Sequence, residues 1–251
     1  MPRPGPWPGT PTRRVARAEP LNAGEGMAEG TARTGPGWLQ TLGPATTTVL
    51  LRHGETALSG ERRFAGRGDI PLTGTGLKQA AAAAERLAAR GGLDLIVTSP
   101  LERTQQTASA VAAATGVPLV ADGGWMETDF GAWEGLNHAE AERGWPEQMA
   151  AWLNDAGATP PGGESFAATS DRVLKALDTL LAEHAGATVL VVSHVTPMKI
   201  LLLHAMLAPP AALRRIQLDV ACLCEIDWYA GGIGVVRSVN DTAHLSLPGM
   251  T

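Results

Sequence analysis

The chain has 251 residues, 44% of them hydrophobic and 18% charged, a composition typical of globular proteins. Its formal net charge of −5 argues against a broad basic surface, so we expect neither nucleic acid nor a membrane as a partner. No apolar run is long enough to span a membrane, and the N-terminus lacks the apolar core of a secretion signal, so the sequence predicts a soluble, cytoplasmic protein.

The beginning of the chain differs from the rest. Residues 1–44 are rich in proline and glycine and show no sustained periodicity, which predicts a disordered tail. Regular apolar patterns begin at Thr46 and continue almost to the end, so we predict one folded domain over residues 45–248.

Three short apolar runs in this domain have the character of buried strands. They are Thr46–Leu51, Leu93–Thr98 and Thr188–Val192. Apart from its start, each is near-continuously apolar, which is typical of strands covered on both faces. Apolar residues at helical spacing lie between them, over residues 77–89 and 173–184. This alternation predicts an α/β fold with a mostly parallel central sheet flanked by helices.

The remaining segments complete this outline. Asp219–Trp228 and Ile233–Val239 are predicted closing strands, and the Trp-, Gly- and Pro-rich stretch Asp122–Gly163 is predicted to be an irregular lid over a site. Cys222 and Cys224 are interpreted as small strand residues, because no further ligands for a metal are visible near them.

Charged or titratable side chains follow each of the first three strands. Arg52 and His53 follow the first, Arg103 lies shortly after the second, and His194 follows the third. Because ligands of open α/β sheets bind beyond the carboxyl ends of the strands, we expect these four side chains to converge.

Two predicted helix starts point to the same edge of the sheet. Ser99 and Glu102 have the spacing of a capping box, and Thr196 followed by Pro197 has the pattern of a second N-cap. Helix N-termini, arginines and histidines together favour a compact dianion such as phosphate. A histidine-bound metal is the alternative, and the arginines oppose it because they raise the cost of binding a cation.

These motifs resemble those of the histidine phosphatase superfamily, also called phosphoglycerate mutase-like. The resemblance covers Thr46 to about Leu247, and its signature is LRHGET at Leu51–Thr56. Further matches occur in order along the chain at Pro71–Thr73, Thr98–Ala108, Asp129–Gly135, Gly162–Ser165 and Val192–His194.

The resemblance implies a role for each matching residue. His53 would be the nucleophile that receives the phosphoryl group, and Glu127 would be the proton donor. Arg52, Arg103 and His194 would bind the phosphoryl oxygens, and neither a metal nor a cofactor would be needed. A carboxyl group that donates a proton must be protonated first, so we expect activity at mildly acid to neutral pH.

Some assignments remain open at this point. Residue types alone do not distinguish Glu127 from Glu55, Asp129 or Glu134 as the proton donor. Ser59 stands where the family often has Asn, so a modified phosphate contact is expected there.

Two further features bear on the substrate. Gly54 of the signature is also expected to bind it. Trp125, Trp133, Trp145 and Trp152 could stack on a substrate or form a small core of the lid, and the second interpretation is favoured.

The segment after the proton donor, Thr128–Gly135, is similar to the phosphatase branch of the family. This branch includes α-ribazole phosphatases and the acid phosphatase half of ribonuclease H–acid phosphatase fusion proteins. We therefore predict a metal-independent phosphomonoesterase acting on a small phosphorylated metabolite, with no nuclease activity and with an exposed sheet edge compatible with a homodimer. The alternatives are a cofactor-dependent phosphoglycerate-type mutase and a non-catalytic module that binds a phosphorylated ligand.

Overall fold

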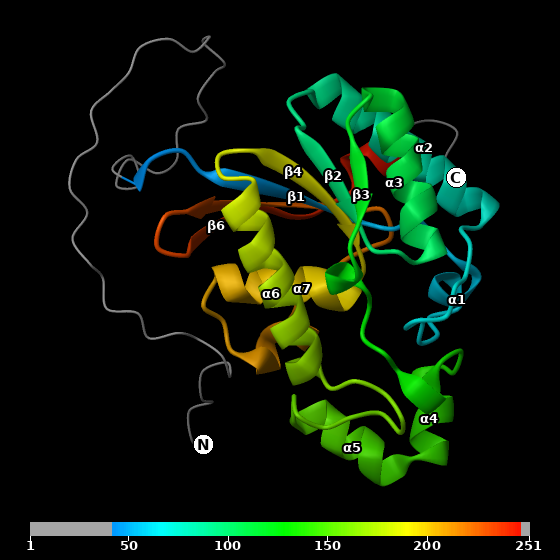
Figure 1. Cartoon of the computed structure of the whole chain (residues 1–251). Coiled ribbons are helices and arrows are strands. Elements are labelled where there is room, and N and C mark those ends of the chain that lie inside the picture. Colours follow the sequence, from blue (N-terminus) through cyan, green and yellow to red (C-terminus); the bar gives the residue numbers. More distant parts are fainter. Residues whose placement is uncertain (1–41, 247–251) are drawn as a thin grey trace, which may run out of the picture.

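The computed structural model describes residues 42–246, so the predicted tail lies outside the described residues except for its last three positions. A six-stranded sheet with the order β3-β2-β4-β1-β5-β6 forms the centre of this part (Figure 1). Within the same residues, no helix has the length and apolar character needed to cross a membrane.

Most of the sheet is parallel, as the sequence predicts. Its parallel strands are β1 (Thr46–Arg52), β2 (Leu95–Thr98), β3 (Leu119–Ala121) and β4 (Thr188–Ser193). Two antiparallel strands close one edge, β5 (Leu223–Tyr229) and β6 (Ile233–Asp241). The three-residue edge strand β3 is absent from the sequence prediction, because its apolar run is too short and too exposed to show a period.

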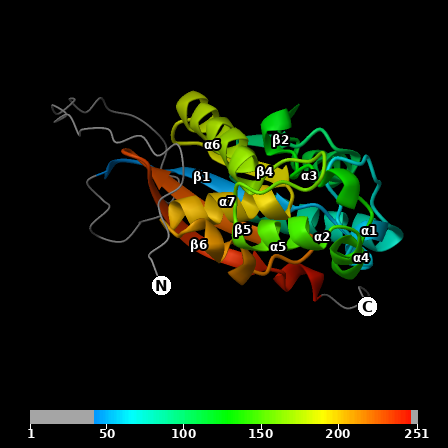
Figure 2. The same cartoon turned by 90° about the horizontal axis from the view of Figure 1, so that it is seen from below.

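Helices cover both faces of the sheet (Figures 1 and 2). One face carries α2 (Gly74–Arg90) and α3 (Glu102–Thr115), and the other carries α6 (Phe166–Glu183) and α7 (Val195–Ala205). Alternate residues of β1 serve the two layers: Val49 and Leu51 pack with α2 and α3, and Leu50 packs with α6 and α7. The predicted α/β class is therefore confirmed.

The predicted lid is more regular than expected. It contains two short helices, α4 (His138–Gly144) and α5 (Pro146–Asn154), and two turns of 3₁₀ helix, η2 (Gly123–Trp125) and η3 (Gly131–Trp133). A capping box between Asn137 and Glu140 begins α4, and Pro146 occupies the first turn of α5. In Figure 1, α4 and α5 lie apart from the sheet, at the bottom of the view.

Three short helical segments complete the fold. They are α1 (Ala57–Gly60), η4 (Pro210–Arg215) and η5 (Ala243–Leu245).

The predicted capping box at Ser99 is wrong. The helix α3 begins at Glu102, and the residue at its N-cap position, Leu101, provides no side-chain cap. Instead, Asp69 accepts a hydrogen bond of 2.6 Å from the Glu102 N–H, and the Ser99 hydroxyl bonds the imidazole of His194 at 2.9 Å. Residues distant in the sequence thus bond the polar groups that the predicted capping box would have used.

The predicted N-cap at Thr196 is also wrong. The helix α7 begins at Val195, with His194 at the N-cap position and no side-chain cap. The backbone N–H of Thr196 instead donates to a carboxylate oxygen of Glu127 at 3.3 Å, and the Thr196 hydroxyl bonds the same carboxyl group. The free N–H groups of this helix start are therefore directed at a carboxyl group.

Candidate active site

The ends of β1 and β4 bring the two histidines together. The two strands run in parallel with Arg52 opposite Ser193, so His53 and His194 follow at the same edge of the sheet. The His53 N–H donates to the Ser193 carbonyl at 3.1 Å, and the ring centroids of the two histidines are 5.2 Å apart. The convergence expected from the strand pattern is present.

His53 is held in one tautomer. Its Nδ1 lies 2.7 Å from the carbonyl oxygen of Gly54, so Nδ1 carries the proton and Nε2 keeps its lone pair. Burial, followed by the charges of Arg52 and Arg103, lowers the pKa of His53 well below its ordinary value. The imidazole is therefore neutral near pH 7, as a nucleophile must be.

Gly54 supports this arrangement with its backbone. Its N–H donates to the Thr107 hydroxyl at 3.2 Å, and a Cβ at this position would lie 2.4 Å from the Gly76 carbonyl oxygen. Only glycine allows the chain to pass so close to α2. Gly54 is expected to bind the substrate, and its N–H is already engaged within the protein.

Two arginines flank the histidines, of which Arg103 is fully buried and Arg52 is partly buried. Arg52 donates to the Leu218 carbonyl at 2.7 Å, and Arg103 donates to the carbonyls of Gly66 and Gly68 at 2.6 and 2.8 Å. These bonds fix both guanidinium groups. Within residues 42–246, the buried Nε atom of each arginine has no hydrogen-bond partner.

His194 presents a third unpartnered nitrogen. Its Nε2 lies 2.9 Å from the Ser99 hydroxyl, while its buried Nδ1 bonds no group among the described residues. Burial, with the nearby Arg103, lowers the pKa of His194 well below its ordinary value, so the ring is neutral. When Ser99 donates to Nε2, Nδ1 carries the proton and can donate to an anion.

Unsatisfied buried donors cost about 1–3 kcal/mol each, and an anion between them removes this cost. The arginine Nε atoms and the His194 Nδ1 are such donors. The His194 ring lies 5.2 Å from the His53 ring, and the charges of both arginines act on His53. This set of groups suits the oxygens of a phosphoryl group.

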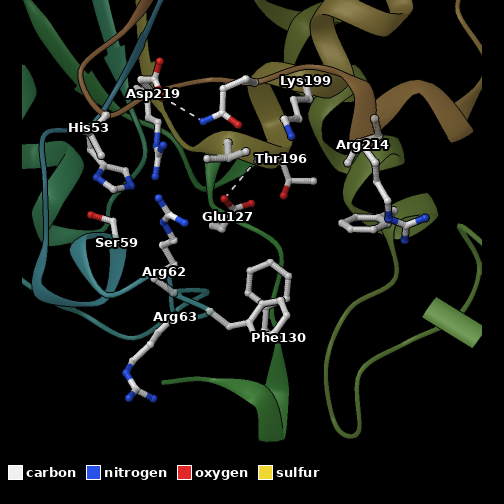
Figure 3. A pocket seen from close by; sticks show the side chains of 18 of the residues that line it. His53, Ser59, Arg62, Arg63, Glu127, Phe130, Thr196, Lys199, Arg214 and Asp219 are labelled. Carbon is white, nitrogen blue, oxygen red and sulfur yellow. Dashed lines mark hydrogen bonds between the residues drawn. The ribbon is translucent and has the colours of Figure 1, made fainter. Parts of the chain in front are cut away.

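Glu127 and His53 both line one cavity, which has a volume of about 850 Å³ (Figure 3). One carboxylate oxygen accepts from the Thr128 N–H at 2.8 Å and the other from the Thr196 N–H at 3.3 Å. Burial raises the pKa of Glu127, and these hydrogen bonds only partly oppose the shift. A buried carboxyl group of this kind can hold a proton for a leaving group.

The three other carboxyl groups left open by the sequence have structural partners. Glu134 accepts from the Gly66 and Gly68 N–H groups, Asp129 accepts from the Gly131 N–H, and Glu55 accepts from the Thr73 hydroxyl. None of the three lines the cavity that contains His53 and Glu127 within the described part of the chain.

Ser59 lines the cavity, but its hydroxyl is engaged. It accepts from the Thr56 N–H at 2.8 Å and lies 3.1 Å from the Thr56 carbonyl, while the Thr56 hydroxyl caps the Ser59 N–H in return. This capping box begins α1. A contact between Ser59 and phosphate would need the hydroxyl to leave one of these bonds.

Four cationic residues of the cavity are missing from the sequence analysis: Arg62, Arg63, Lys199 and Arg214. Arg62 has a φ of 56°, a backbone conformation that sequence alone does not reveal. Lys199 was detectable, because it lies three residues after Thr196 and therefore on the same side of α7.

The tryptophans divide between the two proposed uses. Trp125 and Trp133 are fully buried, which fits a core role. Trp152 packs edge-on against Trp133 and also lines the cavity, together with Phe130 and Phe166. The aromatic cluster therefore forms both the core of the lid and an apolar wall of the cavity.

Among residues 42–246, no three His, Cys, Asp or Glu side chains are grouped closely enough to hold a metal ion. Cys222 and Cys224 are both buried and free, and only Cys224 belongs to a strand, β5.

Comparison with known proteins leads to one family. The model of the histidine phosphatase superfamily (branch 1) matches residues 48–242. A bifunctional protein of Mycobacterium tuberculosis is 48% identical over 212 residues, which cover 84% of this chain and 58% of that protein. The chain therefore spans little more than half the length of this relative.

Two further matches cover nearly the whole of the other protein. A Yersinia enterocolitica protein described as a phosphoglycerate mutase is 38% identical over 210 residues, covering 80% of this chain and 95% of that protein. A solved structure of a mycobacterial glucosyl-3-phosphoglycerate phosphatase with VO3 matches this chain with a TM-score of 0.72 and 30% sequence identity. The match covers 79% of this chain and all of the phosphatase chain. Phosphatase and mutase names thus both occur among the similar proteins.

Proposed function

Because the chain belongs to the histidine phosphatase superfamily, branch 1, we propose that it hydrolyses a small phosphomonoester through a phosphohistidine on His53. The membership itself confirms the resemblance drawn from the sequence motifs. The observation that carries the proposal is the neutral, tautomerically fixed His53 beside three buried donors without partners.

The first step transfers the phosphoryl group to the protein. Nε2 of His53 attacks phosphorus, and the bond from phosphorus to the ester oxygen breaks. Glu127 gives its proton to the leaving oxygen, so the alcohol departs neutral. Arg52, Arg103 and His194 donate to the phosphoryl oxygens, where negative charge gathers in the transition state.

The second step returns the protein to its starting state. Glu127, now ionised, takes a proton from a water molecule as this water attacks phosphorus. The bond between phosphorus and Nε2 breaks, phosphate is released, and His53 regains its lone pair. No metal takes part in either step of this proposal.

Phosphate release from a panel of small phosphomonoesters, measured in EDTA, tests the proposal. We expect release by the wild type and none above background by His53→Ala. The control is His138→Ala, which changes an exposed histidine of α4 and is expected to behave as wild type. Release that survives His53→Ala, or that requires an added metal, would contradict the proposal.

A mutase is the second candidate, because a relative at 38% identity carries that description. A mutase moves phosphate between two positions of one substrate with little net release. Incubation with 3-phosphoglycerate and catalytic 2,3-bisphosphoglycerate, followed by ³¹P NMR, separates the two outcomes. The phosphatase proposal predicts inorganic phosphate, whereas accumulation of 2-phosphoglycerate would favour the mutase.

A further inference from the structure

The cavity beyond His53 has more positive charge than one phosphate needs. Its lining residues include Arg52, Arg62, Arg63, Lys199 and Arg214. Arg63 is neutralised by ion pairs with Glu61 and Glu140. Among the described residues, the other four cations form no ion pair with a carboxylate.

The cavity has few anions to balance them. The carboxyl groups that line it belong to Glu127 and Asp219. Burial favours the protonated form of Glu127. Asp219 accepts hydrogen bonds of 2.8 and 3.0 Å from Asn240 and Gln217, which lower its pKa, and the charge of Arg52 adds to this shift, so Asp219 is ionised and offsets only one of the four cations. A phosphoryl dianion would therefore leave positive charge in the cavity uncompensated.

Two of the cations lie away from the reacting centre. Figure 3 shows His53 and Arg62 on one side of the pocket and Lys199 and Arg214 on the other, with Glu127 between them. Arg62 is therefore placed to assist the phosphoryl group itself. Lys199 and Arg214 are placed beyond Glu127, on the side where a leaving group would extend.

Lys199 is the stronger indication of a ligand. It projects from α7 into the pocket, is partly buried, and its ammonium group has no hydrogen-bond acceptor among residues 42–246. Burial lowers its pKa, and the carboxyl group of Glu127 opposes this shift. Within residues 42–246, the Lys199 Nζ is not one of the buried polar atoms without a partner, so water reaches it in the empty cavity and an anion that enters the cavity can bond it in place of water.

Arg214 has a mixed role. Its guanidinium donates to the Trp152 and Leu153 carbonyls and lies 5.1 Å from the Trp152 ring centroid. These contacts anchor the end of α5 and at the same time hold the cation at the cavity wall. Trp152 and Phe130 place an apolar surface beside it.

We infer that Lys199 and Arg214 form a second anion subsite, so that the preferred ligand carries a carboxylate or a second phosphate on the group esterified to the transferred phosphate. This inference rests on the proposed function for its chemistry. Carboxylates and phosphates both accept hydrogen bonds from ammonium and guanidinium groups, so they share the recognition chemistry. A phosphomonoester with an uncharged leaving group is expected to be a poorer ligand.

Lys199 could instead influence the reaction only indirectly, through the effect of its charge on the carboxyl group of Glu127. Such an effect would alter proton transfer equally for charged and uncharged leaving groups. Equilibrium binding of phosphonates involves no proton transfer to a leaving group, so it isolates the subsite. It also remains measurable if the protein hydrolyses nothing.

The test compares dissociation constants by calorimetry for three ligands: butylphosphonate, butane-1,4-bisphosphonate and 4-phosphonobutanoate. In the wild type we expect both doubly functional ligands to bind about 10- to 100-fold more tightly than butylphosphonate. The comparison of bisphosphonate with phosphonobutanoate then shows which second anion is preferred. Lys199→Met and Arg214→Met are each expected to lower this ratio towards one.

Two controls remove charge elsewhere. Lys175→Met changes an exposed lysine of α6, and Arg215→Met changes the exposed arginine next to Arg214, outside the lining of this cavity. Both are expected to keep the wild-type ratio. Equal affinity of the wild type for all three ligands would overturn the inference, and so would a ratio that survives in Lys199→Met.

The proposed hydrolysis and the proposed subsite can each be wrong independently of the other. If butylphosphonate and the bisphosphonate follow the expected pattern but no phosphate is released from any ester, hydrolysis is wrong and the subsite stands. If esters are hydrolysed but the wild-type binding ratio is one, hydrolysis stands and the subsite is wrong.

Discussion

The imidazole of His53 and the carboxyl group of Glu127 are both buried, and burial disfavours the charged form of each. Burial lowers the pKa of His53 and raises the pKa of Glu127, so both shifts extend the pH range in which each group is neutral. In this state one can attack phosphorus while the other still holds a proton. The proposed complementary roles of the two side chains thus rest on the same physical cause.

The substitution Glu127→Gln tests the proton donor. We expect the rate with an alkyl phosphate to fall about 10²- to 10⁴-fold, because the poor leaving group needs a proton. With p-nitrophenyl phosphate, whose leaving group needs no proton, the first step should survive. Stopped-flow absorbance should then show a burst of nitrophenol close to one per protein, followed by slow turnover, because the base for the second step is lost. Equal losses with both substrates and no burst would contradict this role.

The pH dependence of kcat/KM follows from the two shifted pKa values. Activity should rise as His53 loses its proton, below the usual histidine range, and fall as Glu127 loses its proton, above the usual glutamate range. The optimum is therefore expected at mildly acid to neutral pH. In Glu127→Gln the fall of kcat/KM at higher pH that is due to this carboxyl group should disappear. Titration of the substrate itself affects the wild type and the variant equally. A purely alkaline wild-type optimum would refute the assignment.

Much of the candidate site could be predicted from local sequence. Arg52, His53 and His194 directly follow apolar strands, so their convergence was predictable from strand order alone. Glu127 was not, because it lies in an irregular segment after η2 and its carboxyl group is distinguished only by where the chain places it. Arg62 depends on a left-handed backbone conformation that no residue pattern indicates.

At the scale of elements, α6 holds the segment that carries Glu127. Arg172 of α6 donates to the Gly124 and Met126 carbonyls, each at 2.9 Å, and to a carboxylate oxygen of Glu164 at 2.9 Å. One planar guanidinium therefore ties α6 to the backbone just before Glu127.

Arg172→Lys keeps the charge and loses this fork of donors. We expect kcat to fall about 10²-fold, because a small displacement of Glu127 misaligns proton transfer. The KM should change much less, since the phosphate donors are untouched. Steady-state kinetics with an alkyl phosphate provides the measurement, and Lys175→Met on the same helix is the control. An increase in KM at unchanged kcat would show that Arg172 does not position Glu127.

A close contact between α2 and the loop after β1 can be tested with two glycines of one helix. A Cβ at Gly76 would lie 2.1 Å from the Glu55 carbonyl oxygen, whereas one at Gly74 would have no neighbour within 4 Å. Gly76→Ala should therefore lower the free energy of unfolding by about 1–3 kcal/mol and reduce activity, because the loop that carries Gly54 must move.

Gly74→Ala is the matched control. It should leave the free energy of unfolding unchanged or raise it by up to about 1 kcal/mol, because alanine is the better helix former. Urea unfolding of both variants gives the comparison. Equal effects at the two positions would mean that the close approach is not structurally important.

At the scale of the whole molecule, the fold was largely predictable because its central strands are buried on both faces. β1 and β4 are buried along almost their whole length and each contains an apolar run after a threonine start, so the parallel sheet could be inferred from them. The short edge strand β3 and the helices α4 and α5 escaped prediction, since brief elements show too few turns or alternations to establish a period. The predicted helix starts at Ser99 and Thr196 are wrong because residues distant in the sequence bond the polar groups that a local cap would use. The Ser99 hydroxyl bonds His194, and the Thr196 N–H bonds Glu127.

The molecule also concentrates positive charge where its composition would not suggest it. The chain carries a formal net charge of −5, yet the cavity is lined by several unpaired cations. A positive cavity in an acidic protein attracts anionic ligands locally without attracting polyanions to the whole surface. Net charge alone therefore gave no indication of this positive cavity.

The most direct test of the central claim is detection of the phosphoryl group on His53. Wild type and Glu127→Gln are mixed with p-nitrophenyl phosphate, quenched in alkali after milliseconds to seconds, and digested for mass spectrometry under conditions that preserve phosphohistidine. We predict a phosphate on the peptide containing His53, transient in wild type, persistent in Glu127→Gln and absent in His53→Ala. Phosphate release without any phosphate on His53, or with the adduct on another residue, would contradict the account.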